Sequence, residues 1–201
     1  MINLKSIAGC VAVVACTLTA CNNAAPEAEG LKSGLNPADF DTVINKKQVK
    51  LYTLRNANGV EIDITNFGGR VVSIMVPDRD GHFQDVVLGY DNVAQYADSV
   101  NSPSDFGAAI GRYANRINKG QIEIEGQKYQ LATNNFGHCL HGGPSGWQYQ
   151  VYDVVESNDS VLKMTIASPD GDNGFPGNVK ATVTYTLTSN NALDIAFEGT
   201  T

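Results

Sequence analysis

Basic residues are scarce in this 201-residue sequence. Lysine and arginine together number 14 against 21 aspartates and glutamates, which leaves a formal net charge of −7. Proteins that bind nucleic acids gain most of their affinity from basic patches that displace the counterions of phosphate groups. We therefore expect no nucleic-acid partner.

Long apolar runs are also absent, and the most apolar stretch lies near the N-terminus. Lys5 precedes an apolar segment, residues 7–15, that is shorter than the roughly 20 residues a membrane-spanning helix needs. A positive residue followed by a short apolar segment is typical of an export signal. The segment leads into Leu18-Thr19-Ala20-Cys21, which resembles the lipobox of bacterial lipoproteins. The resemblance implies cleavage before Cys21 and a lipid on that cysteine; the alternative is an ordinary secretory signal with an incidental cysteine.

Both interpretations predict an exported protein, and the first anchors it to a bacterial membrane through a lipid. Asn22 rather than aspartate follows Cys21, which by the rule for enteric lipoproteins favours the outer membrane, facing the periplasm. Residues 1–20 are therefore predicted to be a lipoprotein signal peptide. Residues 21–48, rich in Ala, Asn, Glu, Gly and Pro with little apolar periodicity, are predicted to be a lipidated, flexible spacer.

Cysteine is rare in the chain that such cleavage would leave. Of four cysteines, Cys10 and Cys16 lie in the predicted signal and Cys21 carries the predicted lipid, so Cys139 stands alone. An internal disulfide in the mature chain is thereby excluded. We expect no metal site, because Cys139 has no second cysteine and no carboxylate at ligand spacing. Cys139 is predicted to be a small buried apolar residue.

Helical periodicity is nearly absent from residue 49 onward. Only residues 92–100 could hold a helical turn, whereas apolar and polar residues elsewhere alternate with the period of a half-buried strand. Asn58-Gly59 is typical of a hairpin turn, and turns are also predicted at residues 78–81, 125–126, 158–159 and 190–191. The predicted strands are residues 49–54, 60–65, 71–76, 85–88, 121–125, 128–131, 147–156, 161–167, 179–187 and 193–197. This spacing favours one all-β domain over residues 49–201, an antiparallel β-sandwich.

Residues 111–143 concentrate polar groups among glycines and apolar residues. The stretch contains Gly111-Arg112-Tyr113-Ala114-Asn115-Arg116-Ile117 and, after a predicted hairpin, Leu140-His141-Gly142-Gly143. Polar groups in apolar surroundings need a partner or a ligand. Asparagine, arginine and neutral histidine together offer the donors and acceptors that vicinal hydroxyl groups require. The stretch therefore indicates a pocket for a polar ligand.

These two motifs are followed by Ser168-Pro169-Asp170-Gly171-Asp172-Asn173-Gly174-Phe175-Pro176-Gly177, and the three together resemble the aldose 1-epimerases, or galactose mutarotases. The resemblance covers residues 49–201, about the N-terminal half of a family member. It implies a galactose mutarotase-like supersandwich fold, truncated at its C-terminus. It also implies interconversion of the α and β anomers of free hexoses such as glucose and galactose, without a metal or an organic cofactor.

The resemblance assigns substrate binding to Asn115, Arg116 and His141, which match the family's Asn-Arg pair and its motif histidine. Arg116 and His141 are 25 residues apart in the sequence, so they converge only if the hairpin of residues 121–131 returns the chain to the same end of the sheet. Ring opening needs an acid and a base, in the family a histidine and a glutamate. Both fall beyond Thr201, so the resemblance implies no catalytic residue here and no activity for this stretch alone.

Other interpretations fit the same residues. Asn115, Arg116 and His141 could form a purely structural hydrogen-bond network at a strand end. The protein could also be a non-catalytic carbohydrate-binding surface lipoprotein, or a lipoprotein used for adhesion, which would not require the three residues together. For Arg112 and His138, a structural role and a contact with ligand both stay open.

Overall fold

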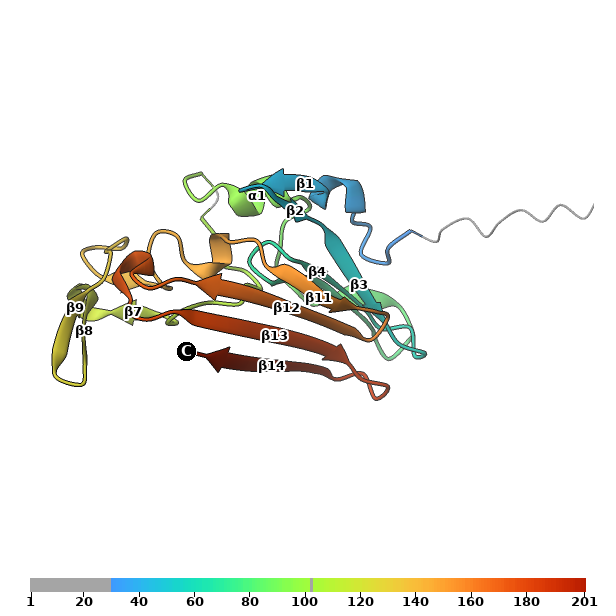
Figure 1. Ribbon diagram of the computed structural model, residues 1–201. Coiled ribbons are helices and arrows are strands. Elements are labelled where there is room, and N and C mark those ends of the chain that lie inside the picture. The colour runs from blue at the N-terminus through green and yellow to red at the C-terminus, as the bar shows by residue number, and fades with distance from the viewer. Residues whose placement is uncertain (1–29, 102) are drawn as a thin grey trace, which may run out of the picture.

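Figure 1 shows the computed structural model of the protein, in which residues 30–101 and 103–201 are described. Two antiparallel four-stranded sheets dominate the fold, with strand orders β3-β4-β5-β6 and β11-β12-β13-β14. The first sheet consists of β3 (Leu51–Arg55), β4 (Glu61–Thr65), β5 (Arg70–Pro77) and β6 (Phe83–Asp85). The second consists of β11 (Asp153–Ser157), β12 (Val161–Ser168), β13 (Val179–Leu187) and β14 (Leu193–Thr200).

Shorter elements surround these two sheets. Three two-stranded sheets pair β1 (Thr42–Ile44) with β2 (Lys47–Val49), β7 (Arg116–Ile117) with β10 (Cys139–Leu140), and β8 (Gln121–Ile124) with β9 (Gln127–Gln130). The helical segments are α1 (Val93–Ala97) and four 3-10 turns, η1 (Pro37–Phe40), η2 (Asn118–Gly120), η3 (Trp147–Tyr149) and η4 (Asp172–Gly174). Among the described residues, no helix has both the length and the apolar character needed to cross a membrane.

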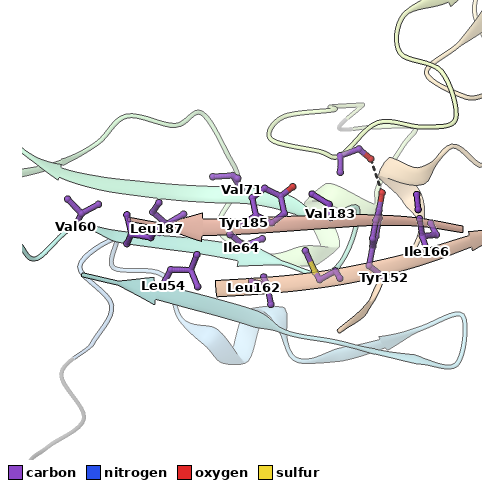
Figure 2. Close-up of a cluster of buried hydrophobic side chains, with 14 residues drawn as sticks. Leu54, Val60, Ile64, Val71, Tyr152, Leu162, Ile166, Val183, Tyr185 and Leu187 are labelled. Atoms are coloured by element: carbon purple, nitrogen blue, oxygen red, sulfur yellow. Dashed lines mark hydrogen bonds between the residues drawn. The ribbon is translucent and has the colours of Figure 1, made fainter. Parts of the chain in front are cut away.

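The core lies between the two large sheets (Figure 2). Alternate residues of each strand face it, among them Leu54 and Ile64 from the first sheet and Leu162 and Val183 from the second, all nearly inaccessible to solvent. Burial of each such side chain contributes about 1.5–3 kcal/mol. Tyr152 also enters the core and donates its hydroxyl hydrogen to a backbone carbonyl, at 3.0 Å, so its polar atom is satisfied. The predicted antiparallel sandwich is confirmed.

Two of the predicted strands differ from the structure. The strand expected over residues 85–88 ends at Asp85, because the Asp85 carboxylate accepts hydrogen bonds from the backbone N–H groups of Ile74 and Val87 and so replaces a strand partner. The strand expected over residues 147–156 begins as η3 and becomes β11 only at Asp153. The turn of η3 is closed by the backbone N–H of Gln150, which donates to the carbonyl of Trp147 at 3.1 Å, while the backbone N–H of Trp147 donates to the carbonyl of Gly111 at 3.2 Å.

The predicted spacer, residues 21–48, is wrong for the part that the structure describes. Residues 30–48 cover the outer face of the first sheet, and in Figure 1 β1 and α1 lie on the side of that sheet away from β12. Phe40 is completely buried there in a second apolar cluster with residues such as Val72 and Tyr96. Polar composition suggested flexibility, but a few apolar side chains suffice to fix a segment on an apolar face. Residues 1–29, with Cys21, lie outside the described residues.

Residues 30–48 also bury polar side chains on the outer face of strand β4. Its residues alternate as for a strand with one solvated face, yet Glu61 and Asp63 are buried. The backbone N–H of Lys32 donates to the Glu61 carboxylate at 2.6 Å, and the hydroxyls of Ser33 and Thr53 donate to the Asp63 carboxylate, each at 2.7 Å. Burial raises the pKa of Asp63, while these two donors act in the opposite direction. The N-terminal segment therefore contributes, through Lys32 and Ser33, two of the polar partners of the buried carboxylates on β4.

Candidate functional site

The pairing of β7 with β10 brings the two polar motifs together. Arg116 lies opposite Leu140 in this antiparallel pair, so His141 follows directly beside it. The β8–β9 hairpin lies between β7 and β10 in the sequence, and it returns the chain so that β10 can pair with β7 (Figure 1). The structure thus brings together Asn115, Arg116 and His141, the residues predicted to bind substrate. Their contact with a sugar stays a prediction.

Asn115 and His141 are joined by reciprocal hydrogen bonds. The backbone N–H of Asn115 donates to Nδ1 of His141 at 3.0 Å, and the backbone N–H of His141 donates to the carbonyl of Asn115 at 3.1 Å. Because Nδ1 accepts, the hydrogen of the neutral imidazole is on Nε2. The local fold therefore turns the Nε2–H of His141 into an available hydrogen-bond donor.

Arg116 is held beside this pair with its guanidinium exposed. Its Nε donates to Oδ1 of Asn135 at 2.9 Å, while its backbone N–H donates to Oδ1 of Asn115 at 2.8 Å. Across residues 30–101 and 103–201, the two terminal nitrogens of Arg116 have no hydrogen-bond partner. A guanidinium fixed through Nε and free at its other nitrogens is oriented to donate to a ligand.

A cavity of about 420 Å³ opens next to His141. Its walls include Asp105, Asn135, Gln148 and Tyr149. Small-molecule sites in proteins usually measure about 300–1,000 Å³ and carry a few placed polar groups. Arg116 does not line the cavity itself, but it donates to Asn135, which does. The volume and the polar walls suit a small polyhydroxyl ligand.

Two walls of this cavity, at Asp105 and at Gln148, were not predicted from the sequence. Both are held by Arg70, a completely buried residue at the start of β5. The terminal nitrogens of Arg70 donate to the carbonyls of Ser104 and Phe106 on either side of Asp105, and to that of Gln148, at 2.9–3.2 Å. Burial lowers the pKa of Arg70, and the nearby negative charge of Asp105 opposes that change. An arginine at the head of an apolar strand is the only sequence signal of this arrangement.

The other polar residues of the motifs have structural partners. Arg112 donates to the hydroxyl and the carbonyl of Ser168 and to the carbonyls of Pro169 and Pro176, at 2.7–2.9 Å. It therefore ties the end of β12 to the following loop. Nδ1 of His138 accepts from the backbone N–H of Lys119 at 3.1 Å and stabilises a turn. For both residues the structure supports the structural alternative.

Cys139 is fully buried in a small apolar cluster with Leu131 and Phe175. Burial raises the pKa of its thiol, so the nucleophilic thiolate is disfavoured. Among the residues described, no group of three or more His, Cys, Asp and Glu side chains could hold a metal ion. Cys139 thus packs as the small apolar residue that the sequence predicts.

Known proteins resemble this chain over most of its length. The sequence pattern of the aldose 1-epimerase family matches residues 50–201. The aldose 1-epimerase of Escherichia coli K12 is 36% identical over 151 residues, which are 75% of this chain and 43% of that protein. The aldose 1-epimerase of Haemophilus influenzae is 38% identical over 152 residues, 75% of this chain and 42% of that protein. The chain spans less than half the length of these relatives.

Solved structures share the fold as well as the sequence. A GalM/aldose epimerase homologue from C. elegans superposes with a TM-score of 0.71 at 31% identity, over 76% of this chain and 46% of that one. A galactose 1-epimerase from Lactobacillus acidophilus gives a TM-score of 0.68 at 26% identity, over 79% of this chain and 46% of that one. With the matching sequence pattern and the shared sandwich, this chain belongs to the aldose 1-epimerase family.

Proposed function

We propose that the protein is an aldose 1-epimerase, an isomerase that interconverts the α and β anomers of free hexoses such as glucose and galactose. Membership of the family over residues 50–201 supports this activity. The observation that carries it is the convergence of Asn115, Arg116 and His141 beside a polar cavity of monosaccharide scale.

The three residues bind and orient the sugar in this proposal. His141 donates through Nε2–H, and Arg116 donates through its two terminal nitrogens, to hydroxyl or ring oxygens of the hexose. Asn115 holds the imidazole through its backbone N–H and lies within the same cluster. Ring opening needs one group that protonates the ring oxygen and one that takes the anomeric proton. In this proposal the described residues contribute binding and orientation.

Loss of sugar binding is expected when these donors are removed. Arg116→Ala and His141→Ala should each weaken binding of D-galactose or D-glucose by about 10- to 150-fold, equivalent to about 1.5–3 kcal/mol, because each removes a donor from the ligand. The measurement is an NMR titration of the full chain with each sugar, alongside a thermal unfolding curve for each variant.

The matched controls are an arginine and a histidine that lie outside the candidate site. Arg79 and His82 have side chains that are 94% and 76% exposed in the turn before β6, so Arg79→Ala and His82→Ala should bind sugar as the unmodified protein does. Unchanged sugar affinity in Arg116→Ala and His141→Ala, with both variants folded, would remove these residues from the site.

We further propose that the protein is exported and held on a bacterial membrane, the outer one facing the periplasm, by a lipid on Cys21. The apolar segment of residues 7–15 and Leu18-Thr19-Ala20-Cys21 support this localisation. Cys21→Ser should move the protein from the membrane fraction to the soluble fraction, because the lipid is its only anchor in this proposal. Cys139→Ser changes a buried cysteine instead and should leave the protein in the membrane fraction. Equal partitioning of the unmodified protein and Cys21→Ser would rule out the anchor.

A further inference from the structure

Two residues that line the cavity beside His141 carry hydrogen-bond acceptors that the protein itself does not satisfy. Among the described residues, Oδ1 of Asp105 and Oε1 of Gln148 are buried atoms without a hydrogen-bond partner. Gln148 is only 2% exposed, and both residues line the cavity. A buried acceptor left unpaired destabilises the folded protein. These two atoms are shielded from solvent, whereas the other carboxylate oxygen of Asp105, Oδ2, faces His141.

We infer that Asp105 is a further ligand-binding residue of this cavity, which accepts a hydrogen bond from a hydroxyl group of the bound sugar. The inference rests on the proposed function, since it concerns how the same cavity selects its hexose. It adds a carboxylate to a site otherwise built from arginine, asparagine and histidine.

The position of Asp105 relative to His141 supports the assignment. Oδ2 of Asp105 lies 3.8 Å from Nε2 of His141, too far for a direct hydrogen bond. One hydroxyl oxygen can nevertheless lie within about 2.8 Å of both atoms. Such a hydroxyl would accept from the Nε2–H of His141 and donate its own hydrogen to Asp105. His141 then pairs with the oxygen of the hydroxyl, and Asp105 pairs with its hydrogen.

A structural role for Asp105 as a counterion for Arg70 is the main alternative. The guanidinium of Arg70 nevertheless directs its hydrogen bonds to backbone carbonyls on either side of Asp105 and at Gln148. Within the described part of the chain, no ion pair within 4.0 Å joins Asp105 to Arg70. Arg70 therefore fixes the backbone that carries Asp105, while the carboxylate is left to face the cavity.

An ionised carboxylate can only accept hydrogen bonds, and this defines what the cavity selects. A sugar that carries a hydroxyl at the bridging position satisfies both Asp105 and His141. A deoxy sugar lacking that hydroxyl leaves both unpaired, and sites built around a substrate hydroxyl reject such analogues strongly. Asp105 would thus discriminate among hexoses by the presence and direction of one hydroxyl.

A comparison of deoxy sugars with Asp105 variants tests the inference. The affinities of the full chain for D-galactose, D-glucose and each monodeoxy derivative of these two sugars are measured by NMR titration. In the unmodified protein, removal of one particular hydroxyl should weaken binding about tenfold or more. Asp105→Ala should weaken binding of the parent sugar about tenfold. It should leave the affinity for that deoxy sugar unchanged, because the deoxy sugar already lacks the hydroxyl that Asp105 binds. Asp105→Asn, which preserves the shape of the side chain, should show the same pattern to a smaller extent.

Each outcome of this experiment decides between the claims. The control Asp194→Ala, an exposed residue of β14, should bind every sugar as the unmodified protein does. If folded Asp105→Ala and Asp105→Asn also do so, the inference fails while the proposed function stands. If they lose affinity equally for the parent and all deoxy sugars, Asp105 acts only on the structure and the inference fails. If the unmodified protein binds none of the sugars, the inference and the proposed function both fail.

Discussion

Arg70→Met is expected to lower the free energy of unfolding by about 3–5 kcal/mol, the range for removing one partner of a buried charged network. Arg70 is completely buried at the start of β5. Methionine has a similar length and is apolar, but it donates no hydrogen bond. The carbonyls of Ser104, Phe106 and Gln148 would lose the donors that now reach them at 2.9–3.2 Å. Chemical denaturation of the two proteins measures the difference.

The aromatic surroundings of Arg70 do not replace these bonds. Its guanidinium carbon lies 5.0 Å from the ring centroid of Tyr96 and 5.8 Å from that of Phe67, and contacts of this kind contribute about 0.5–2 kcal/mol. Methionine would keep favourable contacts with the rings. The free energy of unfolding of Arg70→Lys should lie between those of the unmodified protein and Arg70→Met. An ammonium group retains the charge but lacks the planar guanidinium that reaches several carbonyls at once.

The control for Arg70→Met is Arg79→Met. The side chain of Arg79 is 94% exposed and lies 3.6 Å from Asp80, so its replacement should change the free energy of unfolding by no more than about 0.5 kcal/mol. A loss below about 1 kcal/mol for Arg70→Met would show that the buried guanidinium is not what holds the loops carrying Asp105 and Gln148.

The second large effect is expected for Gly142→Ala, which should lower the free energy of unfolding by about 2–5 kcal/mol. Gly142 follows His141 and has a φ of +81°, a conformation that costs an L-residue about 1–2 kcal/mol. A Cβ atom at this position would also lie 1.9 Å from the carbonyl oxygen of Gly111. The backbone must move to relieve that clash, and overpacking of this kind costs about 1–3 kcal/mol.

Gly126→Ala separates the conformational cost of a positive φ from the cost of the steric clash. Gly126 also has a φ of +81°, but a Cβ atom there would meet no other atom within 4 Å. Its substitution should cost only the conformational part, about 1–2 kcal/mol. Gly142→Ala should in addition weaken sugar binding about tenfold or more, because it displaces His141 from Arg116. Equal losses of stability in the two variants would show that the contact between residues 111 and 142 is not tight.

Hairpins and strands of this fold were predictable because their signals are local. Asn58-Gly59 and Glu125-Gly126 both lie in the turns predicted for them, and at the second turn both residues have positive φ, +50° and +81°. Turn geometry of this kind is selected by two adjacent residues. Apolar residues at every second position of β13 likewise face the core as the alternation predicts.

The errors of prediction fall where the partner of a segment is distant. Residues 30–48 are polar enough to suggest a spacer, yet Phe40 is buried against the outer face of a sheet built from residues 51–85. Residues 147–150 alternate like a strand, but Trp147–Tyr149 form η3, and the backbone N–H of Trp147 pairs with the distant carbonyl of Gly111. Composition and periodicity describe a segment by itself, whereas burial depends on which surface it meets.

The candidate site likewise contains residues that the sequence identified and residues that it did not. Asn115, Arg116 and His141 were identified from the sequence, because their motifs resemble a known family and a hairpin signal lies between them. Asp105 and Gln148 were not, because their place at the cavity depends on Arg70, whose hydrogen bonds span 34, 36 and 78 residues of the chain. The sequence by itself determined most of the strands, the turns and the family. Only the tertiary structure decided which carboxylate and which amide line the cavity beside His141, since buried polar groups are placed by long-range partners and leave no local pattern.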